Sequence, residues 1–441
     1  MRQFSEALMK ASSELQKALT AAGASGIALQ PEDLESALVE ELLIQQPLLR
    51  LLKVKQASAR VHEIIRRTGH GKAAYEGASV TGVATQSTYD RPTVTLKVAD
   101  YWGEVEGLLK AATKKGLDAL LLEQNAGIEA IGDILDFGIK WGNAVADPYM
   151  IDGLDVLVRT NIQDINAVAS LGYLDAMVNA ATQWRETKQD PFVFLMSKGM
   201  ISKVSGLQTL ARRQVNEIEF EGKFTMKTYD GFPLLEDPSM KPPAASPAAF
   251  TATIGAGGAL PAATYYYRIA AVRPDGECIA AAEDDCISAG APGNATAVLA
   301  WTADANALLY KIYRSSSLGA GAGGETLLTT IAAKNRDATG LYTTNVVTWS
   351  DDGTAVAPGG AASELPLDAG HESIFLVNLN PDRGAALVGL LNTLGEEVDN
   401  LMSYIPLATR KNAYEFMLAC FHALQVPWEK LHVRARRVKI A

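Results

Sequence analysis

The chain has few cysteines and no residue pattern that would bind a metal. Its 3 cysteines are Cys278, Cys286 and Cys420, and their spacing matches neither a zinc site nor an even disulfide framework. Cys278 and Cys286 could pair, but two free thiols are the expected state. We therefore expect a reducing compartment and no structural metal.

Long apolar runs are also missing. No stretch of ~20 consecutive apolar residues is present, so no membrane-spanning helix and no membrane partner are expected. The first residues, MRQFSEALMKASSELQKAL, carry charges throughout and lack the apolar core of a secretion signal. The composition, 48% hydrophobic and 20% charged, is that of a folded soluble protein with roughly two to four domains.

Motifs that carry catalysis are absent. The 5 histidines form no Ser-His-Asp set or HExxH motif, and no GxxxxGK[ST] loop occurs. We expect no enzyme activity and no cofactor, and we expect Asp155 and Asp164 to be solvated or helix-capping. The net charge of −10 gives no electrostatic case for nucleic-acid binding. An acidic protein can still enclose nucleic acid as a closed shell, because containment needs no base contacts.

A long amphipathic helix is predicted at residues 115–141. Its apolar side chains recur at three- and four-residue spacing. Gly127, Gly132 and Gly138 each weaken a helix by up to about 1 kcal/mol relative to alanine. We expect them to be tolerated where something packs closely against that face.

The segments before this helix differ in character. Residues 1–54 are predicted to form a helical arm. Residues 55–102 are locally basic, with strand-like VHEII (61–65) and PTVTLKVADYW (92–102) on either side of a polar, glycine-containing stretch. This predicts an extended two-stranded β-arm, which is marginal in isolation and needs a partner surface. The candidate subunit-interface residues are Arg60, Arg66, Arg67, Lys72, Tyr75, Tyr89 and Arg91.

A mixed α/β region follows the long helix. Predicted strands are 154–160, 192–197, 217–231 and 232–237, and predicted helices are 161–186 and 197–214, the second capped by the end of the strand before it. After residue 362 we expect a strand at 373–381, a turn or short helix at 383–391, and two or three strands within 414–441.

Residues 243–362 form an insert of different composition. It follows the linker KPPAASPAA and contains short, regularly spaced strands with turn signals such as PDGE and SDDG. The strands YYYRIAAV, LAWT, YKIYRS and VVTWSDDG resemble those of bacterial fibronectin type III and related immunoglobulin-like modules. An all-β sandwich is therefore predicted. Its expected core residues are Tyr266, Trp301, Tyr313 and Trp349.

The order of these segments resembles the tailed-phage major capsid protein of Hong Kong 97 type. The resemblance is carried by PTVTLKVADYWGEVEGLLKAATKKGLDALLLEQNAGIEAIGDILDFGIKWGNAVADP (92–148), FVFLMSKGMISKVSGL (192–207) and YEFMLACFHALQVPWEKLHVRARRVKIA (414–441). It implies an α+β fold with a spine helix at 115–141. It also implies a peripheral domain (103–144 and 411–441), an axial domain (145–242 and 363–410), and an insert that projects outward.

The resemblance further implies a structural function. The expected role is self-assembly, through hexamers and pentamers, into the icosahedral head of a bacteriophage virion that encloses double-stranded DNA. Assembly would occur in the host bacterial cytoplasm, with a portal, a decoration protein and a separate scaffolding protein as partners. Some relatives in this family crosslink an arm lysine to an asparagine of a neighbour, and Lys72, near the expected arm tip, is the candidate lysine here.

Three other interpretations stay open. An encapsulin-like nanocompartment shares the fold, although it is usually shorter. A glycan-binding adhesin would use the β-sandwich, although no secretion signal precedes it. An enzyme with an accessory fibronectin-like domain has the least support, because no catalytic motif is found. Particle size in solution separates the shell interpretations from the other two.

Overall fold

The computed structural model describes residues 46–71, 85–107, 110, 119–183, 191–211, 217–220, 224–261, 263–287, 295–315, 325–354, 364–390, 396–399, 402–407 and 412–440. The predictions for residues 1–45, for the tip of the β-arm at 72–84 and for residues 115–118 lie outside this part of the chain.

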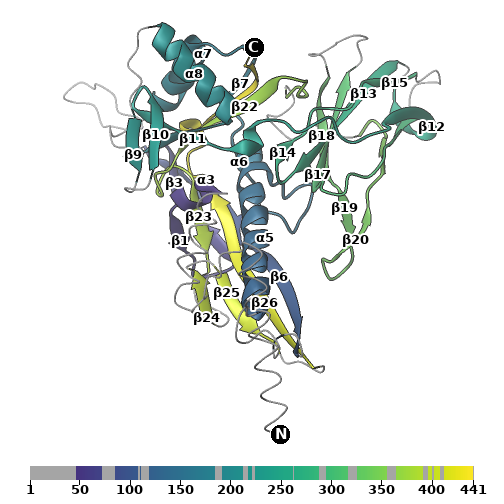
Figure 1. Ribbon diagram of the computed structural model, residues 1–441. Helices are drawn as coiled ribbons and strands as arrows, with labels where there is room; N and C mark the ends of the chain where they lie inside the picture. Colours follow the sequence, from purple (N-terminus) through teal and green to yellow (C-terminus); the bar gives the residue numbers. More distant parts are fainter. Residues whose placement is uncertain are drawn as a thin grey trace, which may run out of the picture.

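The predicted long helix is present as α5 (Ala119–Trp141) and lies along one face of a six-stranded sheet (Figure 1). A Cβ on Gly127 would lie 2.5 Å from the ring of Tyr101 and 2.9 Å from Leu418, which are on the two strands beneath the helix. The expected close packing at this glycine is therefore confirmed. The sheet contains β1 (Val54–Gln56), β23 (Ala386–Gly389), β26 (Ala413–Gln425), β25 (Met402–Pro406) and β24 (Glu396–Asp399), with β6 (Lys97–Glu106) paired to β26.

A seven-stranded sheet lies at the C-terminal end of α5 (Figure 1). On its central strand β8 (Phe192–Met196), Phe192, Phe194 and Met196 share a buried cluster with the helices α7 (Leu171–Thr182) and α8 (Lys198–Leu210). Val193 and Leu195 point the other way, into a cluster with the end of α5. Burial on both faces explains the continuous apolar run FVFLM. The strand order is β7 (Ile162–Val168), β27 (Val433–Lys439), β22 (His371–Asn378), β8 (Phe192–Met196), β11 (Phe232–Glu236), β10 (Phe224–Tyr229) and β9 (Glu217–Phe220).

Local signals account for the helices of this sheet. α8 (Lys198–Leu210) begins where the Ser197 hydroxyl accepts a hydrogen bond from the Met200 amide at 3.1 Å, so the predicted strand-to-helix cap is confirmed. The predicted helix 161–186 is instead the strand β7 followed by α7 (Leu171–Thr182). The predicted strand 154–160 begins as the one-turn helix α6 (Leu154–Leu157).

The end of the chain divides between the two sheets, which differs from the expected grouping of 411–441 in one domain. β26 belongs to the six-stranded sheet, whereas β27 pairs with β22 and β7 in the seven-stranded sheet. Residues 386–389, expected as a turn or short helix, form β23 beside β26. The short 3-10 helix η2 (Glu429–Leu431) lies between β26 and β27.

In the described part of the insert, two antiparallel sheets share one buried cluster. The three-stranded sheet has β12 (Thr251–Leu260), β16 (Ala295–Ala300) and β21 (Thr348–Asp351). The five-stranded sheet has β14 (Gly276–Glu277), β13 (Thr264–Arg273), β17 (Leu309–Ser315), β18 (Thr326–Ala332) and β15 (Asp284–Ile287). A hairpin of β19 (Lys334–Arg336) and β20 (Tyr342–Asn345) follows, and the 3-10 helix η1 (Pro238–Met240) precedes the insert.

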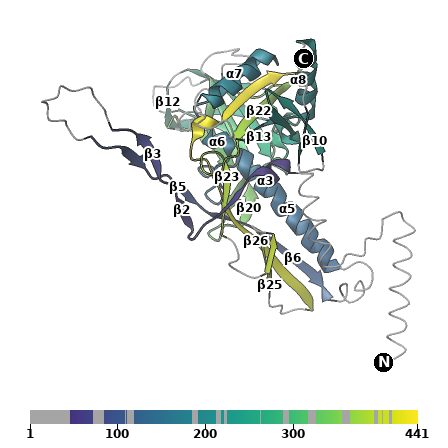
Figure 2. The ribbon, with the colours of Figure 1, turned by 90° about the vertical axis from the view of Figure 1, so that its left-hand side faces the viewer.

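The β-arm extends away from the rest of the molecule (Figure 2). It consists of β2 (Val61–Glu63) paired with β5 (Thr93–Thr95), and β3 (Arg66–Gly69) paired with β4 (Thr88–Asp90). Upstream, the short helix α3 (Pro47–Leu51) packs near α5. Among the described residues, no helix has the length and apolar character needed to cross a membrane.

Candidate functional site

The candidate interface residues lie on the β-arm where they are described. Arg67 and Tyr89 face each other across the β3–β4 pair, and both are exposed. Arg66 forms an ion pair with Asp90 at 2.7 Å and donates to the carbonyl of Pro427 at 3.1 Å, which ties the base of the arm to the body. Arg60 and Arg91 are exposed beside the paired strands, and Lys72 and Tyr75 lie outside the described residues.

The arm also exposes large apolar side chains. Ile65 and Tyr89 are 69% and 65% exposed, and Val61 is exposed as well. An exposed apolar set on a two-stranded ribbon is characteristic of a surface that a partner covers.

The candidate core residues of the insert divide between the two faces of its larger sheet. Trp301 is buried between the sheets, where its ring meets Tyr310 edge-on at 5.3 Å, and Trp349 packs partly buried against the same cluster. Tyr266 and Tyr313 are also buried, but they alternate with Tyr267 and Ile312, whose side chains fill that cluster. Because successive side chains of a strand point to opposite faces, both tyrosines lie on the face turned away from the smaller sheet.

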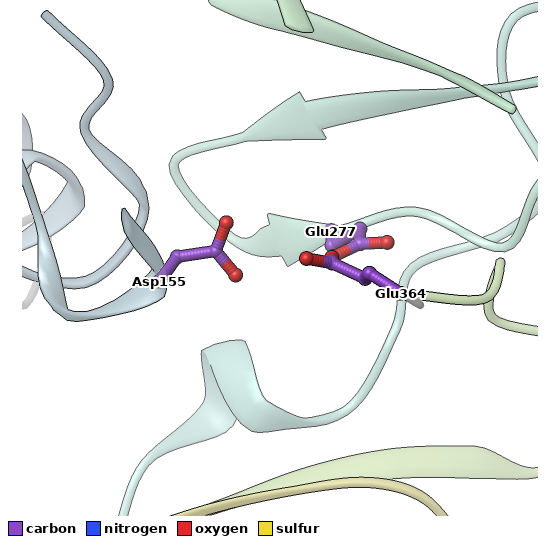
Figure 3. Close-up of side chains that lie close together, drawn as sticks. All are labelled: Asp155, Glu277 and Glu364. Carbon is purple, nitrogen blue, oxygen red and sulfur yellow. The ribbon is translucent and has the colours of Figure 1, made fainter. Parts of the chain in front are cut away.

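That face carries a group of buried charges that sequence reasoning missed. The carboxylates of Asp155, Glu277 and Glu364 converge (Figure 3), with oxygen atoms within 4.8 Å of one another. Carboxylate oxygens in such a set could bind a hard cation. Protein cations already occupy the space around them: Lys311 on β17 and Arg434 and Arg436 on β27.

The contacts form one connected network. The Nζ of Lys311 lies 2.9 Å from Asp155, 2.9 Å from Glu277 and 2.7 Å from Glu364. Arg436 pairs with Glu277 at 2.8 Å and also contacts Glu364, and Arg434 pairs with Asp155. Three acids therefore face three bases, and the side chains of all six are at most 7% exposed. This neutral arrangement does not need a metal ion to compensate the carboxylates.

The local electrostatics agree with a compensated network. Burial by itself would raise the pKa of Glu277, but Arg436, Lys311 and Arg434 hold that pKa well below its ordinary value. Burial lowers the pKa of Lys311, although Asp155 and Glu277 favour its charged form. Tyr313 donates a hydrogen bond to Glu277 at 2.8 Å, and its burial raises its pKa well above the ordinary value.

One expectation changes as a result. Asp155 was expected to be solvated or capping, but it is part of this buried network. Asp164 pairs with Arg437 at 3.2 Å and is partly exposed. The available signal in the sequence was the alternation of Val433, Arg434, Ala435 and Arg436, in which charged residues recur at every second position of a strand. The three cysteines, as expected, are free thiols.

Comparison with solved structures identifies the type of fold. The holo-SrpI encapsulin complex from Synechococcus elongatus PCC 7942 matches with a TM-score of 0.50 and 12% identity, over 90% of this chain and 88% of that one. The chain therefore has a fold similar to that of this encapsulin. No protein-family model and no curated protein matches the sequence.

Two phage structures are also similar to this chain. The capsid of cyanophage A-1(L) has a TM-score of 0.44 and 11% identity, over 90% of this chain and 94% of that one. The procapsid of satellite phage P4 has a TM-score of 0.42 and 8% identity, over 97% and 98%. The Hong Kong 97-type fold expected from the sequence agrees with the encapsulin likeness at the level of the shell-protein fold. Encapsulins and tailed-phage capsid proteins share that fold, so the likeness does not separate them.

Proposed function

We propose that this chain is a structural subunit that assembles into a closed icosahedral shell, and that the shell is the head of a tailed bacteriophage. The β-arm is the observation that carries the proposal. It extends from the body (Figure 2) and exposes Ile65, Tyr89 and Val61 on a ribbon too thin to be stable alone. In a closed shell, every arm would lie on an adjacent copy of the chain, and that copy would cover its exposed apolar side chains.

Charge supports the same interaction. The arm carries the exposed arginines Arg60, Arg67 and Arg91 on a chain of net charge −10. A basic arm against an acidic neighbour gives complementary potentials, which favour correct pairing and suppress wrong contacts. Weak positive charge on the inner surface would also let enclosed double-stranded DNA move without sticking.

The remaining parts of the proposal follow from the resemblance in sequence. Hexamers and pentamers would be the building units, a separate scaffold would guide them, and a portal and a decoration protein would complete the particle. The insert would be an immunoglobulin-like module on the outer surface. Its two antiparallel sheets around one buried cluster support this assignment.

An encapsulin-like compartment is the second candidate. Its support is the likeness to an encapsulin complex, with a TM-score of 0.50. The two candidates differ in what the particle holds, because a phage head is filled with nucleic acid and a compartment is filled with protein.

The test begins with the full chain, expressed alone and together with candidate scaffold proteins. Size-exclusion chromatography with light scattering, followed by negative-stain microscopy, should show shells or regular five- and six-membered rings. A chain that stays monomeric under every condition would contradict the proposal. For particles isolated from their natural source, nuclease-protected DNA favours the phage head and a single enriched protein cargo favours the compartment.

A further inference from the structure

The six charged residues of the buried network come in equal number from the insert and from the body. The body is the six- and seven-stranded sheets together with the helices that pack on them. The body supplies Asp155, Arg434 and Arg436. The insert side supplies Glu277, Lys311 and, on the segment that returns from it, Glu364. By formal charge, the body side carries one excess positive charge and the insert side one excess negative charge. Each side therefore compensates the other, and separating them would leave a charge unmatched.

A second contact lies at the β19–β20 hairpin. The Arg336 guanidinium binds the buried carboxylate of Asp147 through two nitrogens, at 2.9 and 2.7 Å. The same guanidinium lies 3.9 Å from the ring centre of Tyr342 and 5.0 Å from that of Tyr149. Asp147 and Tyr149 follow the end of α5, so this contact joins the hairpin to the spine helix region.

A third contact is at the entrance to the insert. Lys140, in the last turn of α5, binds Asp237 at 2.8 Å and Ser239 at 2.8 Å in η1. A Cβ on Gly276, the first residue of β14, would lie 2.3 Å from the Ser239 carbonyl oxygen, so the start of this strand packs directly on η1. Val272 of the insert belongs to the same buried cluster as the end of α5.

We propose that the insert is a brace that holds the C-terminal end of α5 and the seven-stranded sheet in one fixed relation. A module on flexible linkers would contact the body little. This insert reaches β27 and α6 through one contact, the segment after α5 through the second, and α5 itself through the third. The inference does not depend on shell formation, because every contact lies within one chain.

The brace predicts that damage on the insert side loosens elements of the body. In Glu277→Gln, Lys311 and the two arginines lose one carboxylate with little change in shape, which leaves buried positive charge uncompensated. Arg336→Gln removes the second contact and leaves the six-charge network intact. The Arg336 side chain is partly exposed, so this change is milder than one in the buried network. Asp275→Asn is the matched control, since this acid lies only two residues before Glu277, in the turn that leads into β14, but is exposed.

Hydrogen exchange of the full-length variants, followed by mass spectrometry, is the measurement. For Glu277→Gln we expect amide exchange in β27 and α6 to rise by roughly tenfold or more, while β16 and β21 of the insert stay protected. For Arg336→Gln the rise should appear at 142–150 and in the last turn of α5. Asp275→Asn should match the wild type.

Exchange that rises only within the insert, or that stays unchanged in both variants, would overturn the brace. If Glu277→Gln does not fold, Arg336→Gln decides the question by the same criterion. Both measurements can be made on unassembled subunits, so a failure of the brace is distinguishable from a failure of the shell proposal.

Discussion

The Nζ of Lys140 lies 2.8 Å from the Oδ2 of Asp237, and the two side chains are only 2% and 3% exposed. Lys140 lies in the last turn of α5, and Asp237 is the N-cap of η1, the segment that leads into the insert. Asp136, one helical turn before Lys140, adds a second carboxylate 2.5 Å from the same ammonium group. At this junction, one buried lysine therefore compensates two buried acids.

Replacing this lysine should be costly. Lys140→Met leaves Asp237 without its cation, and removal of one partner of a buried pair typically destabilises by about 3–5 kcal/mol. The free energy of unfolding from urea titration measures the effect. Lys198→Met is the control, because Lys198 is exposed at the start of α8 and should change stability by less than about 0.5 kcal/mol. Equal effects of the two substitutions would contradict the structural account.

Asp136 should make stability depend on pH. Burial raises its pKa from 3.8 to about 6, although Lys140 opposes the shift. The pKa of Asp136 is higher in the folded state than in the unfolded state. The stability that its neutral form contributes is therefore fully present below about pH 4 and is lost as the pH rises through about 6. We expect Asp136→Asn to remove this part of the pH dependence and to raise stability at pH 7 relative to the wild type. Urea midpoints measured from pH 4 to pH 8 provide the check, and an unchanged slope in the variant would exclude Asp136 as its source.

Two helix glycines should respond in opposite ways to alanine. At Gly127 the new Cβ would meet Tyr101 at 2.5 Å, so Gly127→Ala should destabilise by about 1–3 kcal/mol through overpacking. At Gly206, in α8, nothing lies within 4 Å, so Gly206→Ala should stabilise by up to about 1 kcal/mol through helix propensity. Thermal melts of the two variants and the wild type measure both changes in stability. A Gly127→Ala variant that is as stable as the wild type or more stable would show that packing of α5 on its sheet is looser than described.

The arm should affect assembly and leave the isolated subunit unchanged. Ile65→Ser and Tyr89→Ser remove exposed apolar side chains that make little contact within the chain, so subunit stability should stay within about 0.5 kcal/mol of wild type. The yield of particles in size-exclusion chromatography should fall sharply. Leu341→Ser, at a similarly exposed position on the insert hairpin, is the comparison and should assemble normally. Normal yields in both arm variants would show that these side chains do not form the subunit contact.

The local pattern of residues predicted several elements correctly. Three- and four-residue apolar spacing identified α5, the run FVFLM identified β8, and Ser197 marked the start of α8. These features depend on neighbours within a few residues, so they can be read from a single sequence. The same pattern failed at 161–168, because alternation in IQDINAV was taken as part of the helix that follows it.

The sequence by itself determined the long helix α5, the buried strand β8 and the start of α8, because each depends on residues close together in the chain. Only the tertiary structure decided that β27 joins the seven-stranded sheet and that Asp155, Lys311 and Arg434 meet in one buried network. Strand pairing brings together residues hundreds of positions apart, and local periodicity carries no information about the partner. A buried charge is tolerated only where its compensating charges are also buried, so the position of each depends on the complete fold.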